Sequence, residues 1–179
     1  MKSRAAIGNH PVHPALVSLP IGAFFLVLVG DIAHARTDAD FWYAFSFVCL
    51  GAGILMALVA AIAGFVDYFG VRMSDAGFRA ARIHMVLNLT GVALYTINWF
   101  LRRGNGALHT PRWSLVFGLE VVTFLALGVS GWLGGRVAFE HKVGVVENAD
   151  PEATEIGRLE TSRKVKGGGA RPGPRVRPR

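Results

Sequence analysis

The sequence predicts an all-α integral membrane protein, built as an up-down bundle of four transmembrane helices with both termini in the cytoplasm. Two features of its composition are typical of a membrane protein. Only 17% of the 179 residues are charged, compared with about 25% in ordinary soluble domains, and 52% are hydrophobic. In addition, the apolar residues gather in four long stretches, each about as long as the ~20 residues that a helix needs to cross hydrocarbon.

The four predicted helices cover approximately residues 14–34, 41–66, 83–101 and 113–135. The first contains only one charged residue, Asp31, and the fourth contains only Glu120, while the second and third contain no Asp, Glu, Lys or Arg. Proline is favoured at the first position of a helix. We therefore expect Pro14 to open the first helix, with His13 as its cap.

The positions of the cations predict the orientation, because Lys and Arg in short loops are retained on the cytoplasmic side. With four helices, both termini and the middle loop share one side, which would carry fifteen of the nineteen Lys and Arg residues. The other side would carry only Arg36, Arg102, Arg103 and Arg112. Both termini are therefore expected in the cytoplasm, and the lipid bilayer is the first expected partner.

The chain is expected to have three regions: a cytoplasmic lead-in over residues 1–13, the transmembrane domain over 14–139, and a basic tail over 140–179. The last nineteen residues include seven Lys or Arg and no acidic residue, and they lack the large apolar side chains that a core requires. The tail is thus predicted to be largely disordered. Its charge favours contact with anionic lipid headgroups, and no specific nucleic-acid binding is expected.

Four of the six histidines are predicted to lie at the cytoplasmic ends of the helices. His10 and His13 precede the first helix in NHPVHP, His84 begins the third, and His141 follows the fourth. Asp67 closes the second helix on the same side. Neutral histidines beside a carboxylate suit a transition metal, so these five residues form a candidate metal site. The alternative is that the histidines bond to carbonyls or water, and that Asp67 pairs with an arginine of the next loop.

Haem b is the second candidate cofactor, because inward-facing histidines of a helical bundle can bind haem iron. His84, together with His13 or His141, would supply the axial ligands. Arg72 and Arg82 lie in and just after the middle loop, where they could pair with the haem propionates. The sequence does not decide between haem b and a transition metal.

Other polar residues are interpreted without a cofactor. His34 and His109 fall on the opposite side, in loops, and are expected to be solvated. Glu120 lies within the bilayer, where an ionised carboxylate is costly. We expect it to be protonated, and either hydrogen-bonded across the bundle, for instance with Asn98, or facing water. The alternative is a proton relay, for which a single acid is poorly suited. Cys49 is the only cysteine, so no internal disulfide or iron–sulfur site can form.

Four segments resemble a bacterial family of membrane proteins known as domain of unknown function 2231: HPVHPALVSLPIG, GFVDYF, RIHMVLN and SGWLGGRVAFEHKVGV. The resemblance covers roughly residues 7–146 and implies a multi-pass protein of the bacterial inner (cytoplasmic) membrane, of unassigned function. Some relatives carry a Rieske-type iron–sulfur domain after the four helices, whereas this chain continues into a basic tail without cysteine. By position, the motif residues are His10, His13, Pro20, Gly22, Asp67, His84, Asn88, Gly131, Gly134 and Gly135.

Three functions are compatible with these patterns. The first is a haem- or metal-binding electron-transfer subunit with its site at the cytoplasmic mouth, working with a membrane or redox partner protein. The second is a non-enzymatic scaffold or partner subunit. The third, a small transporter or channel, is least favoured because few polar residues line the predicted helices: Asn88, Thr90, Asn98 and Glu120. The chain contains no G-x-S-x-G, Walker A or H-E-x-x-H motif, which favours a non-enzymatic function without excluding catalysis.

Overall fold

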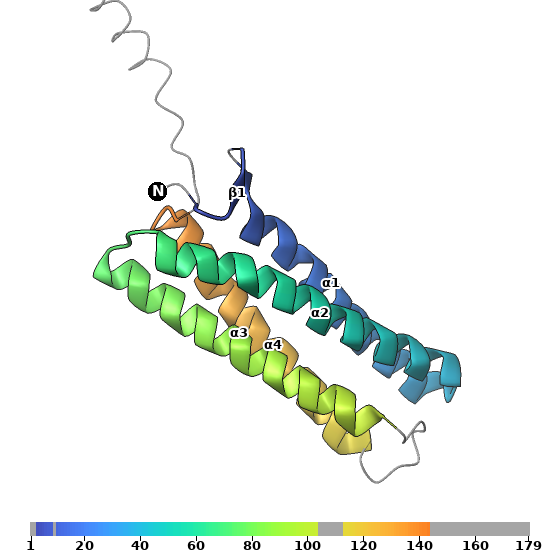
Figure 1. The fold of residues 1–179 in the computed structure, drawn as a ribbon. Coiled ribbons are helices and arrows are strands. Elements are labelled where there is room, and N and C mark those ends of the chain that lie inside the picture. The colour runs from blue at the N-terminus through green and yellow to red at the C-terminus, as the bar shows by residue number, and fades with distance from the viewer. Residues whose placement is uncertain (1–2, 9, 104–112, 144–179) are drawn as a thin grey trace, which may run out of the picture. The chain divides into compact units, whose positions relative to one another are not determined.

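Four long helices make up most of the chain in the computed structural model, which describes residues 3–8, 10–103 and 113–143 (Figure 1). The helices are α1 (Val12–Thr37), α2 (Asp40–Gly70), α3 (Asp75–Arg102) and α4 (Trp113–Phe139). Ahead of them, two short strands pair antiparallel: β1 (Ala6–Ile7) and β2 (His10–Pro11). The predicted tail, residue 109 and the rest of the α3–α4 connection lie outside the described residues.

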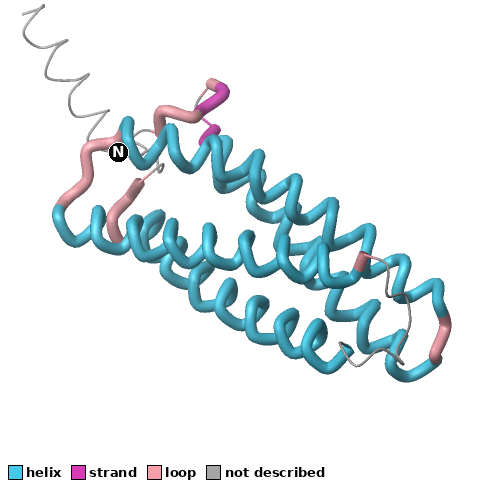
Figure 2. The backbone as a smooth tube through the Cα atoms, turned by 60° about the horizontal axis from the view of Figure 1, so that its bottom comes forward, coloured by secondary structure: helices cyan, strands magenta, loops and turns pink. Residues whose placement is uncertain are grey.

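The helices run up and down along one bundle, with their connections at its two ends (Figure 2). We call the end that holds residues 10–13, 70–75 and 139–143 the proximal end. The end that holds residues 37–40 and 102–103 is the distal end. At the distal end, Asp38 adopts a left-handed conformation (φ 56°) and its N–H donates to the His34 carbonyl, which closes α1 and lets the chain turn directly into α2.

All four helices are long and apolar enough to cross a membrane. Their outer surfaces carry large apolar side chains that are mostly exposed, such as Leu55, Ile62 and Val122. A helix that is apolar around its whole circumference must be covered by lipid as well as by its neighbours. The four predicted transmembrane helices are therefore confirmed as four long apolar helices in an up-down bundle.

Two details of the predicted helix boundaries are corrected. The first helix begins at Val12 with Pro11 as the N-cap residue, so His13 lies inside the first turn and does not cap the helix. Pro14 still fits there, because the N–H groups of the first turn have no partner within the helix. At the distal end, α3 extends to Arg102. This arginine is therefore part of a helix of the bundle and is not the cation of the distal loop that the sequence predicted.

The interior of the bundle is held by a compact apolar cluster. Its buried members are Phe24, Val27, Leu50, Ile54 and Tyr95. The rings of Phe24 and Tyr95 stack with their centroids 4.1 Å apart, and this contact joins α1 to α3 across the bundle axis.

The two halves of the bundle are related as an internal repeat. Three side-chain pairs join α1 to α3, and the partners of every pair are 71 residues apart: His13 with His84, Phe24 with Tyr95, and Asp31 with Arg102. Two helices can bring their equivalent residues together at several positions only if an approximate two-fold axis runs between the helices. The bundle is therefore two helical hairpins, α1–α2 and α3–α4, that face each other.

Contacts inside each hairpin repeat as well. The His13 ring bonds to the carbonyl of Ala60 on α2, and the His84 ring bonds to the carbonyl of Ser130 on α4. Nearer the distal end, Ser46 of α2 donates to the Val27 carbonyl of α1. The equivalent contact in the second hairpin runs the other way, from Asn98 of α3 to the Val116 carbonyl of α4.

Candidate functional site

His13 is held in a fixed orientation by the first hairpin. Its Nδ1 lies 2.8 Å from the Ala60 carbonyl oxygen, and because a carbonyl can only accept, Nδ1 must carry the proton. The ring lies against Gly64, where an added methyl group would be only 3.0 Å from two of its atoms. The absence of a side chain at Gly64 therefore makes the space that this half-buried ring occupies.

His84 is held in the same way by the second hairpin. Its Nδ1 lies 2.8 Å from the Ser130 carbonyl oxygen, and a methyl group at Gly134 would lie 2.7 Å from its Cε1. Asn88, one turn further along α3, donates to the Ser130 hydroxyl at 2.6 Å and to the His84 carbonyl at 2.8 Å. The Asn88 amide nitrogen is 3.3 Å from both ring nitrogens of His84, a position over the ring face and away from the in-plane lone pair.

The two rings face each other near the proximal end. Their centroids are 6.4 Å apart and their planes are nearly perpendicular, at 85°. Because Nδ1 is bonded to a backbone carbonyl in both rings, Nε2 is the ring nitrogen that a neutral histidine would offer to another ligand. A second-sphere bond of this kind, which fixes tautomer and ring direction, is the usual support of metal-binding histidines.

The other residues predicted for a metal site do not gather around this pair. His10 lies exposed on β2, and the His141 side chain lies beside Gly77 in the first turn of α3. Among the described residues, no three His, Cys, Asp or Glu side chains are placed to hold one metal ion. The structure thus brings together His13 and His84, and it leaves the remaining candidates in separate surroundings.

Asp67 has a different partner from the arginine that the sequence suggested. Its carboxylate accepts hydrogen bonds from the Ser3 hydroxyl at 2.8 Å and from the backbone N–H groups of Arg4 and Ala5 at 2.7 and 2.9 Å. It thereby fastens the start of the chain to the end of α2. Arg72 and Arg82, the predicted propionate partners, are exposed at the proximal end.

A second polar cluster lies toward the distal end, and the sequence predicted only one of its contacts, the hydrogen bond between Asn98 and Glu120. Arg102 donates to both carboxylate oxygens of Asp31, at 2.7 and 2.6 Å, and both side chains are fully buried. Arg102 also donates from Nε to the Asn98 side-chain oxygen at 2.9 Å. The Asn98 amide reaches Glu120 at 3.5 Å, which confirms the predicted hydrogen bond between these two residues.

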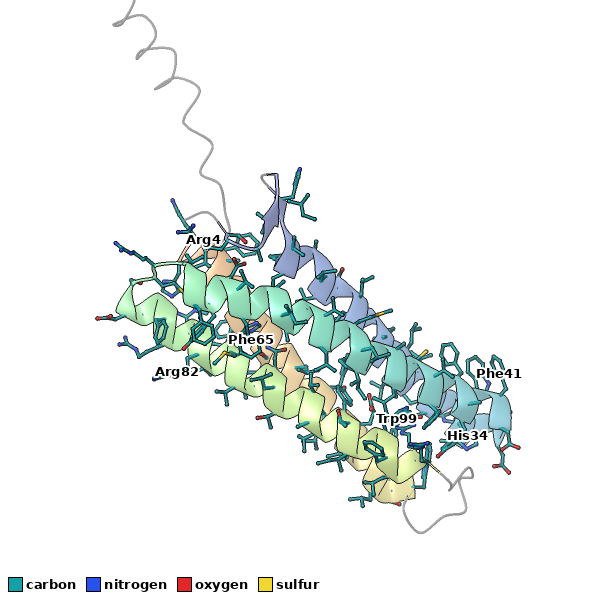
Figure 3. The ribbon with its side chains drawn as sticks, viewed as in Figure 1. Arg4, His34, Phe41, Phe65, Arg82 and Trp99 are labelled. Carbon is teal, nitrogen blue, oxygen red and sulfur yellow. The ribbon has the colours of Figure 1, made fainter. Side chains whose placement is uncertain are left out.

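His34 corrects a prediction. It is fully buried in the last turn of α1 and not solvated in a loop. Its Nδ1 donates to the Ala39 carbonyl at 2.9 Å, and its ring packs against Tyr43 and Trp113, with centroids 5.5 and 5.4 Å away. Figure 3 shows His34 near Trp99 at the distal end, whereas Arg4 and Arg82 lie at the proximal end.

Comparison with known proteins identifies one family. Residues 9–147 match the sequence model of a family described as "Predicted membrane protein (DUF2231)". No curated protein and no solved structure matched the chain.

Proposed function

The chain belongs to the DUF2231 family of predicted membrane proteins, and we propose that it is a haem-binding electron-transfer subunit in which His13 and His84 would hold the haem iron. The observation that carries this proposal is the matched pair of rings at the proximal end. Both have Nδ1 bonded to a carbonyl of the neighbouring helix, which leaves Nε2 as the ring nitrogen that could bind iron.

The separation of the rings suits ligation of one iron from opposite sides. Two metal–nitrogen bonds of about 2.0 Å, with an imidazole ring behind each nitrogen, separate the ring centres by roughly 6 Å. The observed separation is 6.4 Å. A tetrahedral ion would bring the two ring centres closer together than this, so His13 and His84 would suit a haem iron better than a tetrahedral ion.

The number of donors favours haem over a bare ion. Two histidines complete the coordination of an iron that already has four porphyrin nitrogens, whereas a bare transition ion needs further ligands from the protein. No third such donor stands with His13 and His84 in the described part of the chain. The sequence has no C-x-x-C-H motif, so the haem would be of the non-covalent b type.

The surrounding residues would have supporting roles. Arg72 and Arg82 are exposed cations at the same end and would pair with the propionates. Gly64 and Gly134 give the rings room to stand between the helices, and Asn88 fixes the α3–α4 contact behind His84 through Ser130. His10, His141 and Asp67 would not be ligands. The bound haem would supply one-electron exchange with a redox partner at the membrane surface.

Purified full-length protein is expected to bind haem at one per chain. The test is a titration of the detergent-solubilised protein with hemin, followed by a reduced-minus-oxidised absorption spectrum. A Soret shift that saturates at one equivalent, with sharp α and β bands on reduction, is the predicted result. A folded protein that shows neither would overturn the proposal and leave the scaffold function as the better explanation.

We also propose that the proximal end faces the cytoplasm of a bacterial cell, with the basic tail at the anionic headgroups of the inner leaflet. Arg102 is buried in an ion pair. The cations left on the distal side are therefore Arg36 in the last turn of α1 and, after α3, Arg103 and Arg112. The difference in positive charge between the two sides is thus larger than the sequence count suggested. A reporter enzyme that is active only in the periplasm should therefore be inactive when fused after residue 179 and active when inserted between residues 104 and 112. The reverse pattern would contradict this orientation.

A further inference from the structure

The distal polar cluster contains buried oxygen atoms that have no hydrogen-bond partner among the described residues. They are the Tyr95 hydroxyl, the Thr123 hydroxyl and Oε1 of Glu120, and all three residues have no exposed surface. An unpartnered polar atom in a buried site costs about 1–3 kcal/mol, and lipid around the bundle offers it no replacement. Three such atoms in one place indicate that the site holds something more.

The three oxygens come from two neighbouring helices, α3 and α4. Glu120 and Thr123 are three residues apart on α4, so they share a face of that helix. The Tyr95 hydroxyl of α3 lies within hydrogen-bonding range of the Glu120 carboxyl, but the two groups do not have the geometry of a direct hydrogen bond. Asn98, one turn further along α3, contacts the other carboxyl oxygen of Glu120.

Within the cluster, Glu120 is the acidic group that has no counterion of its own among the described residues. Arg102 is already neutralised by its two hydrogen bonds with Asp31, and its Nε is taken by Asn98. The charged and titratable groups around Glu120 are Arg102 and Tyr95 of α3 and Asp31 of α1, while Tyr43 of α2 lies beside the ion pair. An ionised Glu120 would therefore add a net negative charge to a site without solvent, which is strongly unfavourable.

We propose that Glu120, Tyr95 and Thr123 form a buried proton-binding site, in which the Glu120 carboxyl carries the proton and one internal water joins the three oxygens. A buried water typically makes about three hydrogen bonds, and three partnerless oxygens are available here. A protonated carboxyl is neutral, so the excess negative charge is removed. It also has an O–H donor, so the oxygen that lacks a partner can form a hydrogen bond. A proton suits the site better than a metal cation, because among the described residues no three His, Cys, Asp or Glu side chains are placed to hold a metal ion.

Infrared difference spectroscopy of the full-length protein in lipid vesicles tests this proposal directly. At neutral pH we expect the carbonyl stretch of a protonated carboxylic acid, shifted in D₂O and lost in Glu120→Gln. Glutamine has the shape of a protonated glutamate, so this variant should fold. Asp67→Asn is the matched control, because Asp67 accepts hydrogen bonds from backbone N–H groups as a carboxylate, and it should leave the band unchanged.

Two further variants test the water. Tyr95→Phe and Thr123→Val each remove one of its partners, and both are expected to shift the same band. A wild-type protein without the band at neutral pH, or a band that persists in Glu120→Gln, would overturn the proposal. A band that disappears when sodium is added at constant pH would also overturn it, in favour of a metal-cation site.

Discussion

Replacement of Arg102 by alanine is expected to destabilise the bundle by about 3–5 kcal/mol, because it leaves Asp31 as an unpaired charge in a buried site. The pair is fully buried and doubly hydrogen-bonded, so neither water nor a neighbouring side chain can take the place of the guanidinium. Asp31→Ala should have an effect of similar size through the unpaired arginine. Thermal or denaturant unfolding in detergent measures both.

The internal repeat supplies a sharp control for this prediction. Asp31 and Arg102 occupy equivalent positions of α1 and α3, so the exchange Asp31→Arg with Arg102→Asp should restore most of the stability that either single change removes. A surface pair provides the second control: Arg136 and Glu140 also bond at 2.9 Å but are 41% and 53% exposed. Arg136→Ala should cost less than about 1 kcal/mol. Equal losses for Arg102→Ala and Arg136→Ala would show that the buried pair does not hold the hairpins together.

Loss of either ligand histidine is expected to abolish the haem spectrum. His13→Ala and His84→Ala should each remove the low-spin bands and weaken hemin binding by at least tenfold, since one axial bond to iron is lost in each. His10→Ala and His141→Ala are matched controls from the same end of the bundle and should bind hemin as the wild type does. If all four variants lost haem equally, or if none did, the assignment of His13 and His84 would be wrong.

The glycines beside the rings allow a subtler version of this experiment. Gly134→Ala places a methyl group 2.7 Å from His84 Cε1, whereas Gly135→Ala meets nothing within 4 Å. The first variant should reduce hemin affinity by displacing the ring, and the second should not. Because neither change removes a ligand, a selective effect of Gly134→Ala would show that ring position matters.

The fold was predictable because it depends on local patterns. Four uninterrupted apolar stretches predict four helices, and short connections make neighbours antiparallel. That rule alone places the start of α1 and the early part of α3 at one end, which is why His13 and His84 could be assigned to a common site. The hydrogen bond between Asn98 and Glu120 followed from the cost of a lone carboxyl in the bilayer.

The parts of the site that were missed depend on contacts between distant segments. A cation at the end of an apolar stretch resembles a loop residue, and only the side-chain contact between α3 and α1 across the bundle shows that Arg102 meets Asp31, 71 residues away. His34 is buried because Tyr43 and Trp113 cover it, and Asp67 is bonded to residues more than sixty positions earlier. The common 71-residue spacing was the available signal, but a repeat with so few identical residues is hard to see before the contacts are known.

Electron paramagnetic resonance of the oxidised, haem-loaded protein tests the central assignment most directly. If His13 and His84 are both axial ligands with ring planes near the observed 85°, the ferric iron should be low-spin and its signal strongly anisotropic, because perpendicular imidazole planes leave two of the iron d orbitals nearly equal in energy. A high-spin signal would contradict the account, because it would mean that at least one of the two histidines does not bind the iron.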